Sequence, residues 1–227
     1  LGRYSSFLID EAFARQSNVS CNLAQAACVL FDIADDDRAT TLVARTPFYL
    51  TGIPTIYPSR HSAPMGNQAA FVQGLWNLAA AHADNQMALR YGLAALYRWA
   101  AFNGFGSAAA SPQHNLLAAC AVAAMSLKIT AGITLSPEGI EFNPCVPDCF
   151  AGSKTISGIR YRGATFNLTI VGTGSAIKSF VVDGKPQNTN FLHSDVTGEH
   201  NITITLEAPA QPATQHVNIS QPAICPF

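Results

Sequence analysis

The pattern of the chain changes from helical to β within residues 132–147, which read GITLSPEGIEFNPCVP. Before this segment, Ala-rich stretches repeat their apolar residues at the spacing of a helix. After it, Thr, Val, Ile, Gly and Asn form short runs in which apolar and polar residues alternate, as they do in half-buried strands. We therefore expect two domains, a helical one over residues 1–134 and a β-sandwich over residues 135–227.

Five helices are predicted in the N-terminal part, at residues 19–34, 35–44, 67–83, 87–102 and 113–131. The second begins at the acidic cluster Asp35 to Asp37. These carboxylates are expected to cap it, because they accept hydrogen bonds from free N–H groups and oppose the helix dipole. The last helix is apolar on all sides and must be covered on all sides. Five helices provide too few neighbours for that much apolar surface, so we expect the helical part to be incomplete.

The C-terminal part contains alternating segments at residues 156–162, 164–171, 177–182 and 201–206. The dipeptide Asp183-Gly184 lies between two of these segments and is typical of a hairpin turn, since glycine adopts a positive φ without strain. An antiparallel β-sandwich of about seven or eight strands fits the length of this region.

The composition excludes several classes of protein. Of the 227 residues, 48% are hydrophobic and 12% are charged, and the formal net charge is -1. Charged residues are about half as frequent as in an average globular protein, so the chain has enough apolar residues to fold. A near-neutral charge without a basic run argues against nucleic acid as a partner. Polar residues interrupt every apolar stretch short of the about 18 residues that a membrane span needs, so no membrane partner is expected.

The sequons and cysteines favour a secreted protein. Four N-x-Ser/Thr sequons occur, at Asn18, Asn167, Asn201 and Asn218. Alternation places the second and third on the solvated face of their strands. Cys145 and Cys149 flank a short loop that a disulfide can close, which suits an oxidising compartment. Because the chain begins at Leu1 without an initiator Met, we also expect a removed signal or a longer precursor.

The sequence lacks the motifs of the common nucleophilic, nucleotide-binding and metal-dependent mechanisms. No GxSxG elbow, P-loop, GxGxxG, HExxH or EF-hand loop occurs, and no CxxC or Cys/His cluster points to zinc. Neither a cofactor nor a metal is expected, and carboxylate chemistry or binding remains. Glycoside hydrolysis needs two carboxyl groups across the scissile bond. Most acidic residues of the helical part are explained as caps or helix surface, which leaves Asp10 and Glu11, two neighbours that are poorly placed to face each other across a sugar.

Residues 46–64 form a predicted loop whose length is more typical of a functional loop than of a plain connector. Within and just after it, residues 53–67 are the best candidate surface for ligand binding. Side chains suited to stack on a sugar or to hydrogen-bond to its hydroxyls lie in this loop and at two helix starts. They are Tyr57, Arg60, His61, Asn67, Gln68 and His114. The alternative is that Arg60 and His61 are solvated loop residues and that His114 belongs to an N-terminal cap.

Four groups of residues point to a family. They are residues 16–24 with 29–34, Gly66-Asn67 leading to Gly74-Leu75-Trp76, the junction at 132–147, and GIRYRGA at 158–164. Together they resemble the C-terminal half of a six-hairpin glycosidase, one of the (α/α)6-barrel enzymes of the rhamnosidase, trehalase, glucoamylase and sugar-phosphorylase type. The chain departs from that pattern at Gly66, where the family has His, and in residues 104–113, which contain no Glu.

The resemblance implies an α+β fold in which part of an (α/α)6 toroid of helical hairpins precedes the antiparallel β-sandwich. It also implies a secreted glycoside hydrolase that acts on a plant or microbial oligo- or polysaccharide. Its general acid would lie on an N-terminal chain of the same precursor, and Asp10 or Glu11 would contribute to the shared site. Two alternatives stay open: a non-catalytic carbohydrate-binding or structural module, and a polysaccharide lyase on a related toroid.

Overall fold

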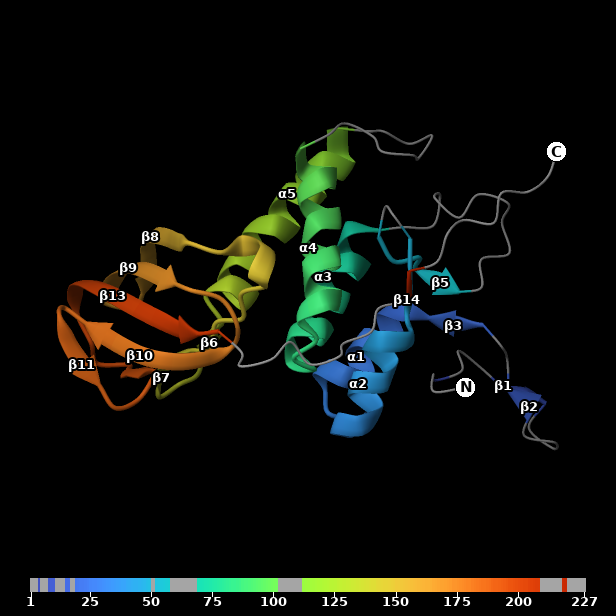
Figure 1. Ribbon diagram of the computed structural model, residues 1–227, viewed down its shortest axis with the longest axis horizontal. Coiled ribbons are helices and arrows are strands. Elements are labelled where there is room, and N and C mark those ends of the chain that lie inside the picture. The colour runs from blue at the N-terminus through green and yellow to red at the C-terminus, as the bar shows by residue number, and fades with distance from the viewer. Residues whose placement is uncertain are drawn as a thin grey trace. The chain divides into compact units, whose positions relative to one another are not determined.

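The chain divides into two compact units, which are described separately below (Figure 1). In the computed structural model, the described residues are 4, 8–10, 15–16, 19–49, 52–57, 69–101, 112–208 and 218–219, with the backbone alone for 8–10, 15–16, 112–118 and 219. A helical unit comprises Leu1–Ala124 and Thr214–Phe227, and a β unit comprises Met125–Ala213. The first division thus falls at Met125, whereas the sequence pattern placed it at residue 135.

All five predicted helices are confirmed within the described residues. They are α1 (Asn22–Leu30), α2 (Asp36–Arg45), α3 (Ala70–His82), α4 (Gln86–Ala101) and α5 (Pro112–Met125). Capping by the acidic cluster is also confirmed. Asp35 is the N-cap of α2, and its Oδ1 accepts a hydrogen bond of 2.8 Å from the backbone N–H of Arg38. Asp36 and Asp37 lie in the first turn, where their charge opposes the helix dipole.

Short strand pairs accompany the helices. β1 (Leu8–Asp10) pairs with β2 (Arg15–Gln16), and β3 (Ser20–Cys21) pairs with β5 (Ile56–Tyr57), both antiparallel. β4 (Pro47–Phe48) pairs in parallel with β14 (Asn218–Ile219). Because β14 pairs with β4, Asn218–Ile219 belongs to the helical unit, although the sequence pattern assigned these residues to the β domain.

The helices are not arranged as an (α/α)6 toroid, and this part of the expected fold is wrong. Successive hairpins of a toroid follow one another around a ring. Here α3 packs against both α1 and α4, while α2 contacts α1 and α3, so the four helices cluster around α3. Trp76, Ala79 and Ala80 of α3 are almost fully buried in this cluster. The apolar surface that suggested missing helices is that of the last helix, and among the described side chains of α5 those of Ala119, Cys120, Ala123 and Ala124 are exposed.

Two fully buried amides hold α3, α4 and the segment before α3 together. Gln73 of α3 accepts a 2.9 Å hydrogen bond from the backbone N–H of Ile53 and donates one of 2.9 Å to Oδ1 of Asn77. Asn77 in turn lies against Gly92 of α4, where an added Cβ would stand 1.9 Å from Asn77 Oδ1. Glycine at position 92 is therefore required by the close approach of these two helices.

The β unit is built from two sheets. A three-stranded antiparallel sheet has the order β12-β7-β6, with β6 at Ile133–Leu135, β7 at Gly139–Phe142 and β12 at Phe191–His193. A five-stranded sheet has the order β11-β10-β13-β9-β8. Its strands are β8 (Ser153–Tyr161), β9 (Ala164–Val171), β10 (Ala176–Val182), β11 (Lys185–Gln187) and β13 (Gly198–Glu207).

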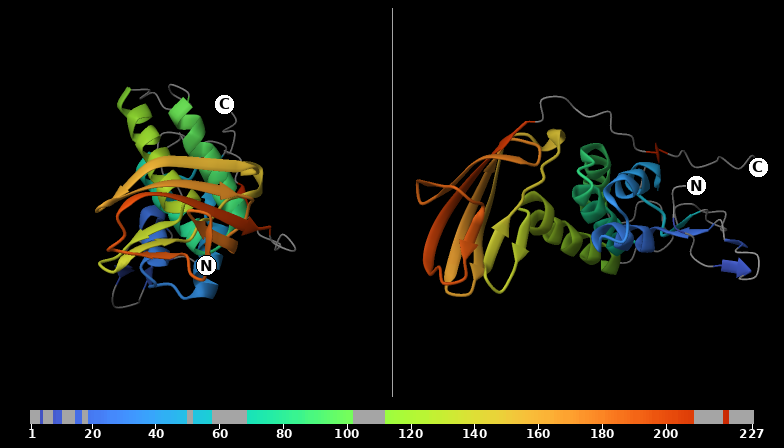
Figure 2. Two further views of the ribbon diagram at one scale, coloured as in Figure 1. Left: turned by 90° about the vertical axis from the view of Figure 1, so that its left-hand side faces the viewer. Right: turned by 90° about the horizontal axis from the view of Figure 1, so that it is seen from below.

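One apolar core lies between these two sheets, whose layers are seen edge-on in the right-hand view of Figure 2. Phe142 of β7 contributes to it from one layer, and its ring centroid lies 5.7 Å from that of Phe180 and 6.4 Å from that of Phe166 in the other layer. All three side chains are almost completely buried. The β part of the prediction, two packed layers with alternating inward residues, therefore describes this unit.

The strand directions differ from the prediction of an antiparallel sandwich. β9 pairs in parallel with β13 over the whole length of β9, from Gly198 opposite Ala164 to Thr205 opposite Val171. Alternation reads the same in both directions, so the sequence pattern contained no signal for this pairing. The predicted hairpin turn is confirmed, because Asp183 and Gly184 both have positive φ and connect the paired residues Val182 and Lys185.

Among the helices that the structure describes, none combines the length and the apolar character that a bilayer crossing requires.

Replacing Gly92 by alanine tests the close approach of α3 and α4. Helix propensity alone would make alanine more stable by about 1 kcal/mol. The new methyl group must instead displace Asn77, so we expect Gly92→Ala to lower the free energy of unfolding by about 2 kcal/mol, measured by urea denaturation of the full chain.

A double-mutant cycle with Asn77→Ala is the control. With the amide removed, most of the cost of Gly92→Ala should disappear, since the two Asn77 atoms nearest the new methyl group are then gone and the next atom, Gln73 Nε2, lies 3.1 Å away. If Gly92→Ala stabilises the chain while Asn77 is still present, the proposed constraint is wrong.

Candidate functional site

The predicted catalytic pair falls mostly outside the described residues. Asp10 ends β1, where its backbone pairs with Arg15 of β2. The side chain of Asp10 and the whole of Glu11 belong to the part of the chain that the structure leaves undescribed. Their catalytic role stays a prediction.

Of the side chains predicted to bind sugar, the structure describes that of Tyr57. This half-buried residue ends β5, and its backbone carbonyl accepts a hydrogen bond of 3.2 Å from the hydroxyl of Ser20 in β3. The other predicted residues of this set lie outside the described residues or, for the last one, have only their backbone described: Arg60, His61, Asn67, Gln68 and His114. Their role in binding sugar stays a prediction.

Two of the four sequons lie side by side. Asn167 of β9 and Asn201 of β13 are paired in register, and Nδ2 of Asn167 donates a 3.4 Å hydrogen bond to Oδ1 of Asn201. Both side chains point away from the core, as the alternation predicted. Asn218 is exposed in β14, and Asn18 lies outside the described residues.

The predicted disulfide is not formed in the structure. Cys145 is buried and Cys149 is exposed, and no disulfide joins any two cysteines of the described residues. The described residues also contain no group of three His, Cys, Asp or Glu side chains that would hold a metal ion.

A polar pocket of the β unit is the best candidate for a site. It has a volume of about 410 Å³ and lies where the chain crosses from β11 of the five-stranded sheet to β12 of the three-stranded sheet. Its described lining comes from the end of β7, from β10, from β11 and from the crossing segment: Asn143, Ser175, Ile177, Lys178, Ser179, Phe180, Gln187, Asn188, Thr189 and Asn190. Its size is within the range of about 300–1,000 Å³ found for small-ligand sites.

Asn190 builds one wall of the pocket. Its Nδ2 donates hydrogen bonds to the backbone carbonyl of Phe142 at 2.8 Å and to Oδ1 of Asn143 at 2.7 Å. Its own carbonyl accepts a hydrogen bond of 3.0 Å from the backbone N–H of Phe142. The crossing segment is thus attached to the end of β7, so this wall is held in place before any ligand arrives.

A β-bulge in β10 shapes the opposite wall. Ile177 pairs with Leu206 and Ser179 pairs with Thr205, so Lys178 is the extra residue of the bulge. The bulge lets Ile177 and Phe180 both face the core despite their odd spacing. It also takes Lys178 out of the normal alternation, and its exposed side chain lines the pocket.

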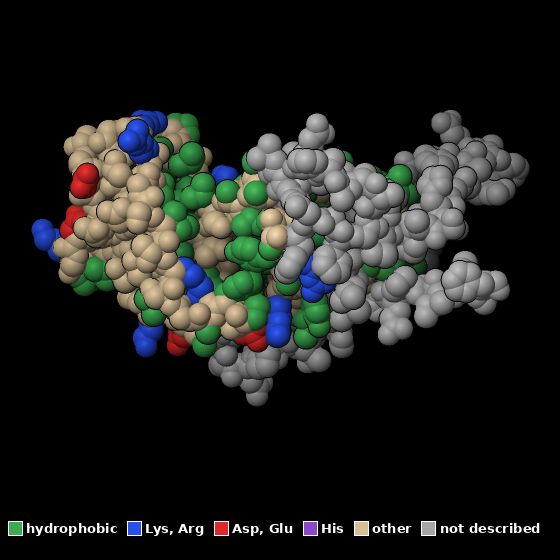
Figure 3. Space-filling model, turned by 90° about the horizontal axis from the view of Figure 1, so that it is seen from above, with side chains coloured by type: hydrophobic (Ala, Val, Ile, Leu, Met, Phe, Trp, Pro, Cys, Tyr) green, Lys and Arg blue, Asp and Glu red, His purple; other side chains and the backbone are tan. Residues whose placement is uncertain are grey.

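The pocket is suited to hydrogen bonding and not to acid–base catalysis. Its described lining is rich in amides and hydroxyls, which offer both donors and acceptors. None of the described lining residues is a carboxylate, which a glycosidase would require as acid and base. On the face of the molecule seen in Figure 3, the coloured Lys, Arg, Asp and Glu side chains are scattered and form no large charged patch among the described residues. The arrangement can bind a neutral or anionic polar ligand.

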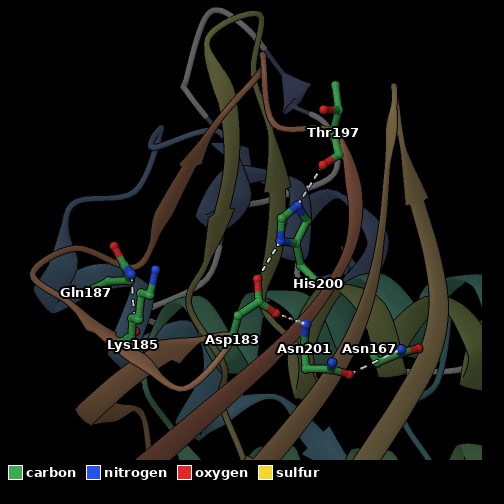
Figure 4. A network of polar contacts seen from close by, with 7 residues as sticks. All are labelled: Asn167, Asp183, Lys185, Gln187, Thr197, His200 and Asn201. Atoms are coloured by element: carbon green, nitrogen blue, oxygen red, sulfur yellow. Dashed lines mark hydrogen bonds and ion pairs between the residues drawn. The ribbon is translucent and has the colours of Figure 1, made fainter.

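A polar network fixes the β10–β11 hairpin that carries part of the pocket (Figure 4). Asp183, at the turn, accepts a hydrogen bond of 2.8 Å from the backbone N–H of Asn201 and contacts Nδ1 of His200 at 2.7 Å. The second ring nitrogen of His200 lies 3.0 Å from the carbonyl of Thr197. Both ring nitrogens face acceptors, so the protonated imidazole is the form that satisfies both contacts.

The electrostatics of this pair follow from its hydrogen bonds. The backbone N–H of Asn201 and the side chain of His200 lower the pKa of Asp183. The hydrogen bond to Asp183 raises the pKa of His200 above its ordinary value, against a smaller opposing effect of burial. The ion pair thus ties the hairpin turn to the start of β13.

No protein-family model matches this chain, and no curated protein matches it significantly. The site is therefore interpreted from its own residues.

Sequence reasoning missed the pocket because its walls come from separate parts of the chain. One local signal was available: residues 188–190 read NTN, a polar run between two strands. The bulge at Lys178 had no comparable signal, since it is defined by pairing with a strand about thirty residues away.

The paired sequons are expected to carry one glycan per molecule. Neighbouring strands lie only about 4.8 Å apart, which leaves little room for two sugars on directly opposite residues. Asn167 is also half-buried and bonded through its Oδ1 to the backbone N–H of Gly158 at 3.1 Å, so Asn201 should be the modified residue. Glycopeptide mass spectrometry of chain secreted from a eukaryotic host checks this. Secreted molecules modified at both residues would contradict it.

The Asp183–His200 pair predicts a pH window of added stability. The raised pKa of His200 contributes stability below about pH 6.5, which is lost as the pH rises through the raised value. The lowered pKa of Asp183 contributes stability above about pH 3.9, which is lost as the pH falls through the lowered value. Thermal unfolding of wild type and Asp183→Asn should therefore differ most near pH 5.

Asparagine suits this comparison because it tolerates the positive φ of position 183 and keeps an acceptor for Asn201. The same change at the exposed Asp195 serves as the control and should give a smaller, less pH-dependent difference. A gap between wild type and Asp183→Asn that is equal at pH 3, 5 and 8 would rule out the charge pair as its cause.

Proposed function

We propose that the β unit binds carbohydrate through the polar pocket between β10, β11 and the segment that leads to β12. The observation that carries this proposal is the lining itself, in which amides and hydroxyls predominate and the described residues include no carboxylate. Sugar hydroxyls both donate and accept hydrogen bonds, and Asn, Gln, Ser and Thr side chains match them in both roles.

The attachment of the pocket wall supports a binding role. Asn190 is held by hydrogen bonds to Phe142 and Asn143, so the wall loses little conformational freedom when a ligand binds. The neighbouring Asn188 and Thr189 are exposed and line the same pocket, where their polar groups are accessible to a ligand. A prepared wall beside accessible polar side chains is what a sugar-binding surface requires.

This proposal corresponds to the non-catalytic carbohydrate-binding alternative. Hydrolysis of a glycoside by Asp10, Glu11 and a partner that carries the general acid stays a prediction. The same holds for secretion and for lyase activity. A binding role for the β unit is compatible with each of these, because recognition of a polysaccharide at one unit does not require cleavage at that unit.

The test is titration of the full chain with neutral trisaccharides of glucose, xylose, N-acetylglucosamine and galactose by isothermal calorimetry. We expect measurable binding of at least one sugar. Replacing Asn188 and Thr189 together by alanine should weaken it about tenfold, since two hydrogen-bonding groups are removed.

Thr155→Ala provides the control. Thr155 is exposed and pairs with Thr169 on the face of the sheet that points away from the core, and it does not line the pocket. It should leave the affinity unchanged. Binding that the Asn188 and Thr189 variant does not alter would place the sugar elsewhere, and a chain that binds no sugar at all, charged sugars included, would refute the function.

A further inference from the structure

The charged residue in the described lining of the pocket bears on which class of sugar the pocket binds. Of its ten described lining residues, Lys178 alone carries a charge. The bulge in β10 sets its side chain at the pocket, and Lys178 is exposed there. β-Bulges are common beside functional sites, where they redirect a side chain.

The nearby carboxylate at the hairpin turn is already engaged. Asp183 is hydrogen-bonded to the backbone N–H of Asn201 and forms an ion pair with His200 at 2.7 Å. Its charge is thereby partly balanced by His200, with a further contribution from Lys185. Lys178 is left as the charged residue of the described lining that can meet a ligand.

We propose that the pocket binds acidic saccharides, with the Lys178 ammonium as the partner of a sugar carboxylate and the Asn and Thr side chains as partners of the hydroxyls. This rests on the proposed carbohydrate-binding function and names its ligand class. A carboxylate accepts a charge-assisted hydrogen bond from an ammonium group, which is stronger than a bond between neutral groups. The amide lining matches the uncharged remainder of the ring.

The experiment compares sugars that differ in charge alone. Trimers of galacturonate, glucuronate and mannuronate, each also as its methyl ester, are titrated into the full chain by calorimetry. At least one acid should bind about fivefold more tightly than its own ester, because esterification removes the charge and leaves the ring in place. Added salt should reduce that ratio, since a surface ion pair is screened.

Lys178→Gln should bring the ratio of acid to ester affinity to about one, while Lys178→Arg should retain a ratio well above one. Circular dichroism confirms that each variant is folded. An acid and an ester that bind wild type equally would overturn the acidic specificity and leave sugar binding intact, as would an unchanged ratio in Lys178→Gln. Absence of binding by acids, esters and the neutral trisaccharides together would overturn the proposed function itself.

Discussion

The packing of Phe142 against Phe166 and Phe180 is the contact on which the β unit depends. It is the place where the three-stranded sheet meets the five-stranded sheet, and burial of each such aromatic side chain contributes about 1.5–3 kcal/mol. Asn143 follows Phe142 directly, and Asn190 bonds to the backbone of Phe142 on both sides of that residue. The same contact that joins the sheets therefore also positions the wall of the pocket.

In the helical unit, buried polar side chains accompany the apolar packing. Gln73 and Asn77 are fully buried on α3, and their hydrogen bonds to each other and to Ile53 satisfy part of their polar capacity. The Gln73–Asn77 bond lies within α3, and the bond from Ile53 attaches the preceding segment to that helix. Because an unpaired buried amide costs about 1–3 kcal/mol, the second bond favours this position of the segment over one that would leave Gln73 without it.

The local parts of the fold were predictable from sequence because their causes are local. Asp35 caps α2 and Asp183-Gly184 turns the hairpin, and each depends only on a few consecutive residues. The outward position of Asn167 and Asn201 follows from alternation within each strand. That these two asparagines lie side by side does not follow, since it depends on the parallel register of β9 with β13.

The sequence by itself determined where the five helices and the four long alternating strands form, which faces of those strands are apolar, and that the chain changes character between residues 132 and 147. Periodicity, capping and turn chemistry act over a few residues, so they can be read along the chain. The tertiary structure decided which helices meet, in which direction β13 joins its sheet, and that Asn143, Lys178 and Asn190 line one pocket. Those outcomes depend on contacts between residues far apart in sequence, whose energies no local pattern contains.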